Sequence, residues 1–87
     1  MSGVALHEGW VILTFADGRP AHAGMLTYVR LKHDLHQWVL AVPPTGSHGG
    51  FEVVMDPKTI ASITPCTERE AVIFANAPAK LREPRTE

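Results

Sequence analysis

The chain has little cysteine, almost no net charge and no long apolar run, and each shortage excludes a class of protein. The single cysteine, Cys66, cannot form a disulfide within the chain, which is typical of the reducing cytoplasm. A formal net charge of −1 creates no overall field that would attract nucleic acid or an anionic membrane. No apolar run approaches the roughly 18–20 residues that span a bilayer, and no signal peptide is recognisable. We therefore expect a cytoplasmic protein with no membrane partner.

The length and composition are those of one small globular domain. The 87 residues are 45% hydrophobic and 20% charged, which is the balance of a folded chain with one modest core. From residue 78 onward, Lys, Arg, Glu and Pro dominate. We therefore predict one domain over residues 1–77 and a flexible tail over residues 78–87.

Two apolar runs joined by a turn signal form the clearest element of the sequence. Residues 10–15 and 21–31 are both rich in strand-forming side chains, and Asp17-Gly18 separates them. This arrangement is typical of a β-hairpin, because glycine accepts the positive φ of a tight turn. Gly24 interrupts the second run and predicts a sharp bend in that strand.

Three further strands are predicted at residues 37–42, 51–55 and 59–64, with a loop over residues 43–50. Asp56-Pro57 predicts a single helical turn before the last of them, with aspartate as the cap and proline at the first position. The predicted fold class is therefore all-β. We expect a five- to six-stranded SH3-like or Sm-like barrel made from a strongly bent antiparallel sheet.

The segment over residues 67–77 supports two interpretations. Thr67 followed by Glu70 has the form of a capping box and indicates a short helix ending before Pro78. The run Val72-Ile73-Phe74 instead favours a strand, because its β-branched and aromatic side chains are poor helix formers. We predict a sixth strand or an extended arm here.

These features resemble the Sm-like family, including its bacterial Hfq branch. The resemblance rests on an alternating apolar strand that runs into Asp17-Gly18-Arg19, followed by Gly24 and Leu26, and on residues 58–65, where Ile60 and Ile63 stand three apart. Val29-Arg30 replaces the family's Phe-Asp pair, and Lys58 alone represents its late basic pair. The resemblance implies a small barrel that binds RNA.

A basic and aromatic set of side chains could serve such binding independently of any family. Cations interleaved with stacking rings are what single-stranded nucleic acid needs, whereas nearby Asp and Glu side chains would oppose it. The candidate nucleic-acid residues are Arg19, Tyr28, Arg30, Lys32 and Lys58.

Metal binding and catalysis find little support in the sequence. His33 and His36, with Asp34 between them, lack a second ligand pair at metal-site spacing and read as a solvated turn. Ser47-His48, with Asp56 downstream, lacks the strand-to-helix elbow that holds a nucleophile in place. We therefore predict no enzyme activity, no metal and no cofactor.

The strongest functional signal is an excess of apolar side chains over what one face of a small sheet can hide. One interpretation is an interface with a second copy of this chain or with a partner protein. The other is that the C-terminal segment covers the outer face within the same chain. The predicted interface residues are Trp10, Ile12, Trp38, Val72, Ile73 and Phe74. The predicted function is a non-enzymatic protein-interaction or self-assembling module of regulatory or phage type, with nucleic-acid binding as the alternative.

Overall fold

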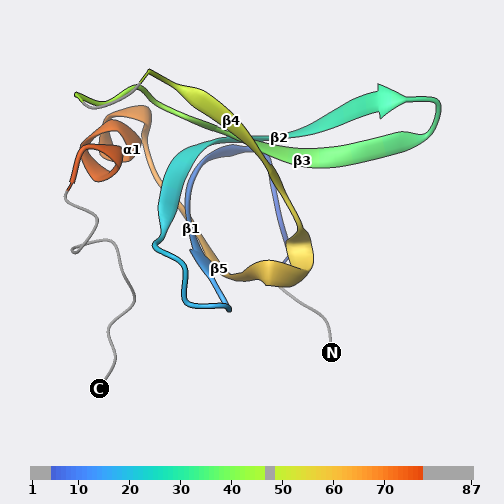
Figure 1. Cartoon of the computed structure of the whole chain (residues 1–87), viewed down its shortest axis with the longest axis horizontal. Coiled ribbons are helices and arrows are strands. Elements are labelled where there is room, and N and C mark those ends of the chain that lie inside the picture. The colour runs from blue at the N-terminus through green and yellow to red at the C-terminus, as the bar shows by residue number, and fades with distance from the viewer. Residues whose placement is uncertain (1–4, 47–48, 78–87) are drawn as a thin grey trace.

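Five strands form one antiparallel sheet in the order β4-β3-β2-β1-β5 (Figure 1). The structure is a computed structural model, and it describes residues 5–46 and 49–77. The elements are β1 (Gly9–Phe15), β2 (His22–Lys32), β3 (Leu35–Val42), β4 (Phe51–Met55), the 3-10 helix η1 (Pro57–Thr59), β5 (Ile60–Pro65) and α1 (Glu68–Ala75). The predicted all-β class and the five predicted strands are confirmed, with ends that differ by one or two residues.

The sheet is strongly bent (Figure 1), and Gly24 lies at the end of the β2–β3 ladder, next to the Met25–Ala41 pair, where the two backbones approach closely. A Cβ added at Gly24 would overlap the carbonyl oxygen of Ala41 and lie 2.9 Å from its carbonyl carbon. Only glycine therefore allows the two backbones to approach this closely.

The bend does not close the sheet into a barrel. Strands β4 and β5 are its two edges, and η1 carries the chain from one edge to the other. Asp56 caps η1 by accepting a hydrogen bond from the backbone N–H of Lys58 at 3.0 Å, as predicted. The expected closed barrel is therefore an open curl, because the turn of η1 replaces a hydrogen-bonded ladder between the edge strands.

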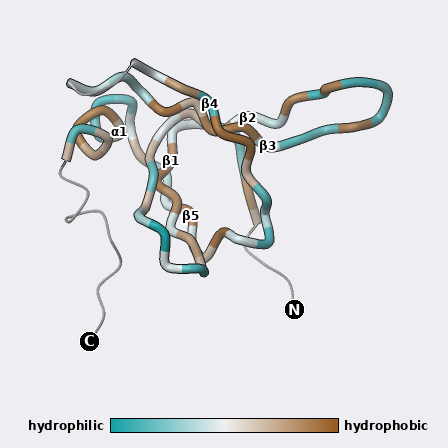
Figure 2. Tube along the Cα trace, in the orientation of Figure 1, coloured by the Kyte–Doolittle hydropathy of each residue, from teal (hydrophilic) through white to brown (hydrophobic). Residues whose placement is uncertain are grey.

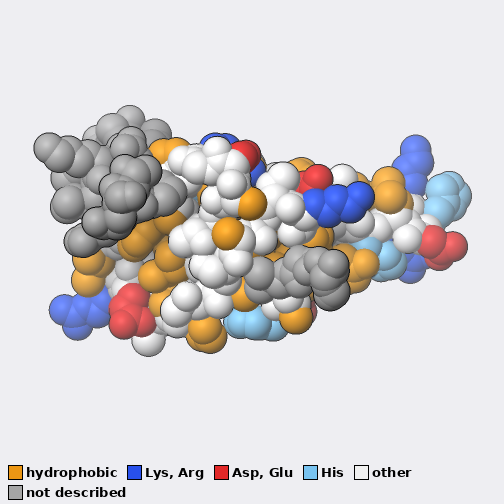
Figure 3. All heavy atoms as spheres, turned by 90° about the horizontal axis from the view of Figure 1, so that it is seen from below, with side chains coloured by type: hydrophobic (Ala, Val, Ile, Leu, Met, Phe, Trp, Pro, Cys, Tyr) orange, Lys and Arg blue, Asp and Glu red, His pale blue; other side chains and the backbone are white. Residues whose placement is uncertain are grey.

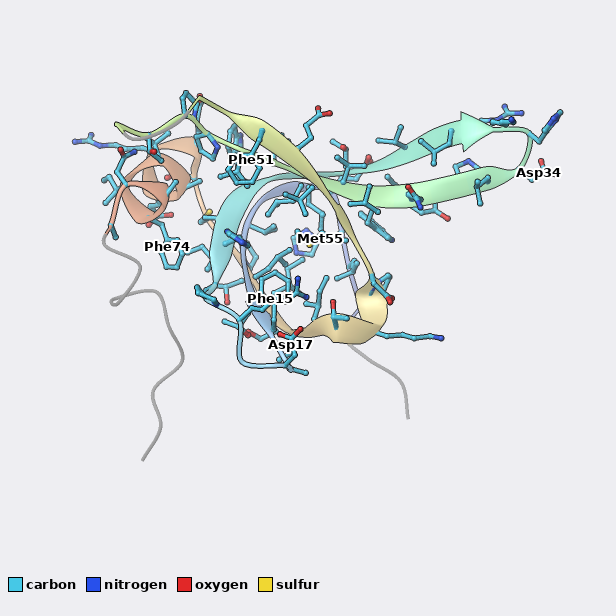
Figure 4. All side chains as sticks on the ribbon, in the orientation of Figure 1. Phe15, Asp17, Asp34, Phe51, Met55 and Phe74 are labelled. Atoms are coloured by element: carbon cyan, nitrogen blue, oxygen red, sulfur yellow. The ribbon has the colours of Figure 1, made fainter. Side chains whose placement is uncertain are left out.

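The concave side of the curl holds the core. Alternate residues of β1, namely Val11, Leu13 and Phe15, are buried there with Leu26 of β2 and Leu40 of β3. Phe15 and Met55 lie inside the curl in Figure 4, and hydrophobic stretches of the strands surround it in Figure 2. This alternation is the one expected for a sheet with a single core-facing side.

The predicted sixth strand is wrong, because residues 68–75 form α1. Its capping box is complete: Thr67 N donates to the Glu70 carboxylate at 2.8 Å, and Glu70 N donates to the Thr67 hydroxyl at 3.1 Å. Ala71 and Ala75 are buried where α1 lies against β2 and β1. The local cap and the two small residues that permit close packing outweigh the β preference of the residues between them.

Two other expectations have simple outcomes. The tail predicted over residues 78–87 lies outside the described residues. Among the residues that the structure describes, no helix has the length and apolar character needed to cross a membrane.

Candidate functional site

The β2–β3 hairpin extends beyond the rest of the sheet (Figure 1). Strand β1 pairs with β2 only over His22–Leu26, and β4 pairs with β3 only from Trp38 onward. Residues 29–37 therefore form a two-stranded ribbon with no third strand paired to either edge, joined at its tip by the turn His33-Asp34. This projecting hairpin, taken with its base as residues 27–39, is the candidate functional site, and its two faces differ in character.

The inner face, which continues the concave side of the sheet, carries a stack of three rings. Tyr28 lies parallel to His36, with ring centroids 5.0 Å apart and an interplanar angle of 13°. The ring centroids of Tyr28 and Trp38 are 4.8 Å apart, and the planes of these two rings are tilted by 41°. The stack arises because Tyr28 pairs directly with Trp38 across the strands, while His36 precedes Trp38 by two residues on β3 and so lies on the same face.

A groove of about 480 Å³ lies alongside this stack. The three rings line one part of it, and the end of β4 and the start of η1 line the rest, including Met55, Asp56 and Pro57. Its size is within the range of ordinary ligand sites. The Asp56 carboxylate is exposed to solvent and forms no salt bridge with any described residue.

The outer face of the hairpin is mostly apolar, with Thr27, Gln37 and Glu52 as its polar members. A second groove, of about 400 Å³, is lined by alternate residues of the two strands and by β4, among them Val29, Leu31, Val39 and Val54. Leu31 is 49% exposed and Val54 57% exposed. We call this surface the outer strip and define it as Val29, Leu31, Leu35, Val39 and Val54.

Charges of both signs flank the outer strip. Lys32 pairs with Leu35 at the tip of the hairpin, and Glu52 lines the groove at the opposite end. Figure 3 shows basic, histidine and acidic side chains gathered at the hairpin end of the molecule, on the right. The strip is thus an apolar surface with a cation at one end and an anion at the other.

The structure places the six predicted interface residues on different surfaces. Trp10 and Ile12 alternate with the buried Val11 and are half-buried on the convex side. Trp38 lies on the opposite side, where it packs against the core. The remaining three, Val72, Ile73 and Phe74, belong to α1, which lies against β1 and β2 within the same chain.

The predicted nucleic-acid residues fall into two groups. Tyr28, Arg30 and Lys32 lie on the projecting hairpin, where Arg30 Nε donates to the carbonyl oxygen of His33 at 2.7 Å. Arg19 is in the β1–β2 loop, where its Nε lies 2.8 Å from the Asp17 carboxylate and its guanidinium lies 4.4 Å from the Phe15 ring centroid. Hydrogen bonds from Arg19 keep the pKa of Asp17 below its ordinary value. The backbone N–H of Arg19 has the larger effect and its side chain the smaller one.

The fifth of these residues, Lys58, is on η1 and is exposed. The predicted cations are therefore not gathered into one continuous patch.

The structure describes the residues considered for metal binding but not all of those considered for catalysis. The described residues contain no group of three or more His, Cys, Asp and Glu side chains that could hold a metal ion. Ser47 and His48, considered for catalysis in the sequence, lie outside the described residues. Cys66 is half-buried, and desolvation together with the nearby Glu70 raises the pKa of its thiol, which lowers its reactivity.

The sequence interpretation missed most of the outer strip and the position of Asp56 in the lining of the groove beside the ring stack. The sequence contains a signal for the projecting hairpin, because the second apolar run is longer than the first. The strand that it forms therefore extends beyond the end of the strand that pairs with it. Alternation within it also places Val29 with Thr27 on the face opposite Tyr28. The position of Asp56 beside the ring stack had no such signal, because it depends on where β4 ends.

A comparison with protein-family models, with curated proteins and with solved structures found no match in any of the three.

Proposed function

We propose that this chain is a non-enzymatic protein-interaction module that associates with a second copy of itself through the outer strip. The observation that carries the proposal is the exposure of this apolar surface on a hairpin that leaves the sheet. Leu35 and Val54 are each 57% exposed, and Leu31 is 49% exposed. Large apolar side chains exposed together on one face are typical of protein–protein contacts.

The occupant that the charges favour is an identical chain. In a two-fold arrangement each copy presents the same strip, so the tip of one hairpin lies over the base of the other. Lys32 of each copy then faces Glu52 of its partner, with the apolar residues between them. The two ends are about 20 Å apart, since six residues of β3 separate them at about 3.3 Å each.

The association is expected to be weak. A strip about 20 Å long and two strands wide covers roughly 200–400 Å² per copy, whereas a stable interface buries about 800 Å² per partner. We therefore expect a dimer that dissociates on dilution. Sedimentation velocity over a hundredfold range of concentration measures the equilibrium directly.

Two matched variants locate the interface. Leu31→Lys places a charge within the outer strip, near its Lys32 end, and is expected to leave a monomer at every concentration. Ile73→Lys places the same charge on α1, where Ile73 is 62% exposed, and is expected to leave the dimerisation constant unchanged. The proposal fails if Ile73→Lys removes the dimer and Leu31→Lys does not.

A charge exchange tests the two-fold geometry. Lys32→Glu and Glu52→Lys each bring like charges together and are expected to weaken the dimer about two- to fivefold at low salt. The double variant restores opposite charges at both ends and is expected to recover wild-type association. Additive weakening in the double variant would exclude the arrangement, and a monomeric wild type at millimolar concentration would exclude self-association.

A further inference from the structure

The inner groove beside the ring stack is not used by self-association through the outer strip. It lies on the opposite face of the hairpin, between Trp38 of β3 and Asp56 at the end of β4. Tyr28 is 51% exposed although it contacts two other rings, so part of this aromatic surface remains open to a ligand.

The groove combines two groups that together recognise a cation. Aromatic rings attract a cation through the negative charge of their faces. A carboxylate adds a full negative charge, and Asp56, one of the lining residues, supplies it. One oxygen of Asp56 accepts the Lys58 N–H, which holds the carboxylate in place on η1.

The same chain already contains this chemistry within its own fold. The Arg19 guanidinium lies 4.4 Å from the centroid of Phe15, and its Nε is 2.8 Å from the Asp17 carboxylate. An arginine is thus held between a ring and a carboxylate two residues away in sequence. The inner groove offers a ring and a carboxylate in the same combination, but among the described residues no arginine of this chain is stacked there.

We infer that the inner groove binds an arginine side chain of a partner protein, with its guanidinium against the Tyr28–Trp38 surface and hydrogen-bonded to Asp56. Arginine fits better than lysine, because its planar guanidinium stacks on a ring and donates to both oxygens of a carboxylate. Single-stranded nucleic acid fits less well, because Asp56 would repel its phosphates.

The test is a titration of the isotope-labelled Leu31→Lys variant, followed by NMR through the Trp38 indole N–H. This background separates the site from self-association, so either proposal can fail alone. The probes are the peptide acetyl-Ala-Arg-Ala-amide and its matched control with citrulline, which has nearly the same shape and no charge. We expect saturable shifts with a millimolar dissociation constant for arginine and binding at least tenfold weaker for citrulline.

Two variants with matched chemistry locate the charge. Asp56→Asn keeps the cap of η1, because asparagine also accepts from a backbone N–H, and is expected to weaken arginine binding at least fivefold. Asp34→Asn removes a carboxylate from the hairpin tip and is expected to leave binding unchanged. Equal binding of the two peptides, an unchanged constant in Asp56→Asn, or displacement of the arginine peptide by oligothymidylate would each overturn the inference.

Discussion

Replacing Gly24 with alanine tests the close approach of the β2 and β3 backbones at the end of their ladder, on which we expect the bend of the sheet to depend. The added Cβ would overlap the Ala41 carbonyl oxygen, lie 2.9 Å from the Ala41 carbonyl carbon and lie 3.3 Å from the Val42 Cα. All three neighbours are backbone atoms. They cannot move aside by changing a rotamer, so the two strands have to separate.

The expected cost follows from what that separation disturbs. Adding a methyl group to a well-packed interior costs about 1–3 kcal/mol. Leu26 and Leu40, which pair with each other one position beyond the Met25–Ala41 pair, are both fully buried, so strands that separate to relieve the overlap also lose core packing. We therefore expect a loss of about 3 kcal/mol in the free energy of unfolding. That corresponds to a fall in melting temperature of roughly 12–24 °C for a domain of this size.

The assay is urea unfolding, followed by tryptophan fluorescence and far-ultraviolet circular dichroism. Two other glycine variants separate lack of space from backbone conformation. Gly46→Ala meets no atom within 4 Å and is expected to change stability by less than about 0.5 kcal/mol. Gly18→Ala also has room, but its φ of +84° is expected to cost about 1–2 kcal/mol.

The order of stability of the three glycine variants tests this explanation of the bend. If Gly24→Ala unfolds at the same urea concentration as Gly46→Ala, the backbones do not meet at this point, and the explanation of the bend is wrong. If Gly18→Ala lowers the free energy of unfolding more than Gly24→Ala does, backbone strain in the β1–β2 loop affects stability more than the close approach of β2 and β3.

Three further outcomes are expected. Thr67→Ala should destabilise the protein by about 1 kcal/mol in urea unfolding, because it removes the cap of α1, whereas Thr67→Ser keeps the hydroxyl and should cost much less; equal losses would contradict the capping argument. The hydrogen bonds that lower the pKa of Asp17 stabilise the folded state at pH values above the ordinary aspartate pKa, so Asp17→Asn should be less stable than the wild type at pH 7. That difference in stability should disappear as the pH falls through the lowered pKa of Asp17. A difference that does not depend on pH would exclude the mechanism. Alkylation of Cys66 by iodoacetamide should reach its half-maximal rate at a higher pH than that of free cysteine, and a lower midpoint would contradict the raised pKa.

Features that depend on neighbouring residues in the chain were predictable from the sequence. The alternation in residues 10–15 places Val11, Leu13 and Phe15 on one face of β1, because successive strand residues point to opposite faces, although both faces are largely apolar and only the fold shows which one enters the core. The cap of η1 at Asp56 and the capping box at Thr67 are likewise local, since each joins groups only two or three residues apart. The bend at Gly24 also had a clear signal.

The C-terminal segment shows where local signals are insufficient. Thr67 and Glu70 favoured a helix, whereas Val72-Ile73-Phe74 favoured a strand, and the sequence alone does not rank the two. The tertiary structure decides for the helix because Ala71 and Ala75 present small side chains at the surface of the sheet, where a helix can approach closely. A pattern of two alanines four apart acquires this meaning only when the surface opposite them is known.

The candidate sites depend on tertiary structure for the same reason. The sequence by itself determined that the chain forms an all-β domain with a long second strand that bends at Gly24 and a capped helical turn before the last strand. Only the fold decided that β1 ends its pairing at Leu26 of β2 and that β4 begins its pairing at Trp38, which leaves a two-faced hairpin projecting from the sheet. The exposure of the outer strip follows from where neighbouring strands stop, and so does the presence of Asp56 and the three rings in the lining of one groove. Strand alternation is a property of consecutive residues, whereas the length over which a strand is covered is a property of its partners.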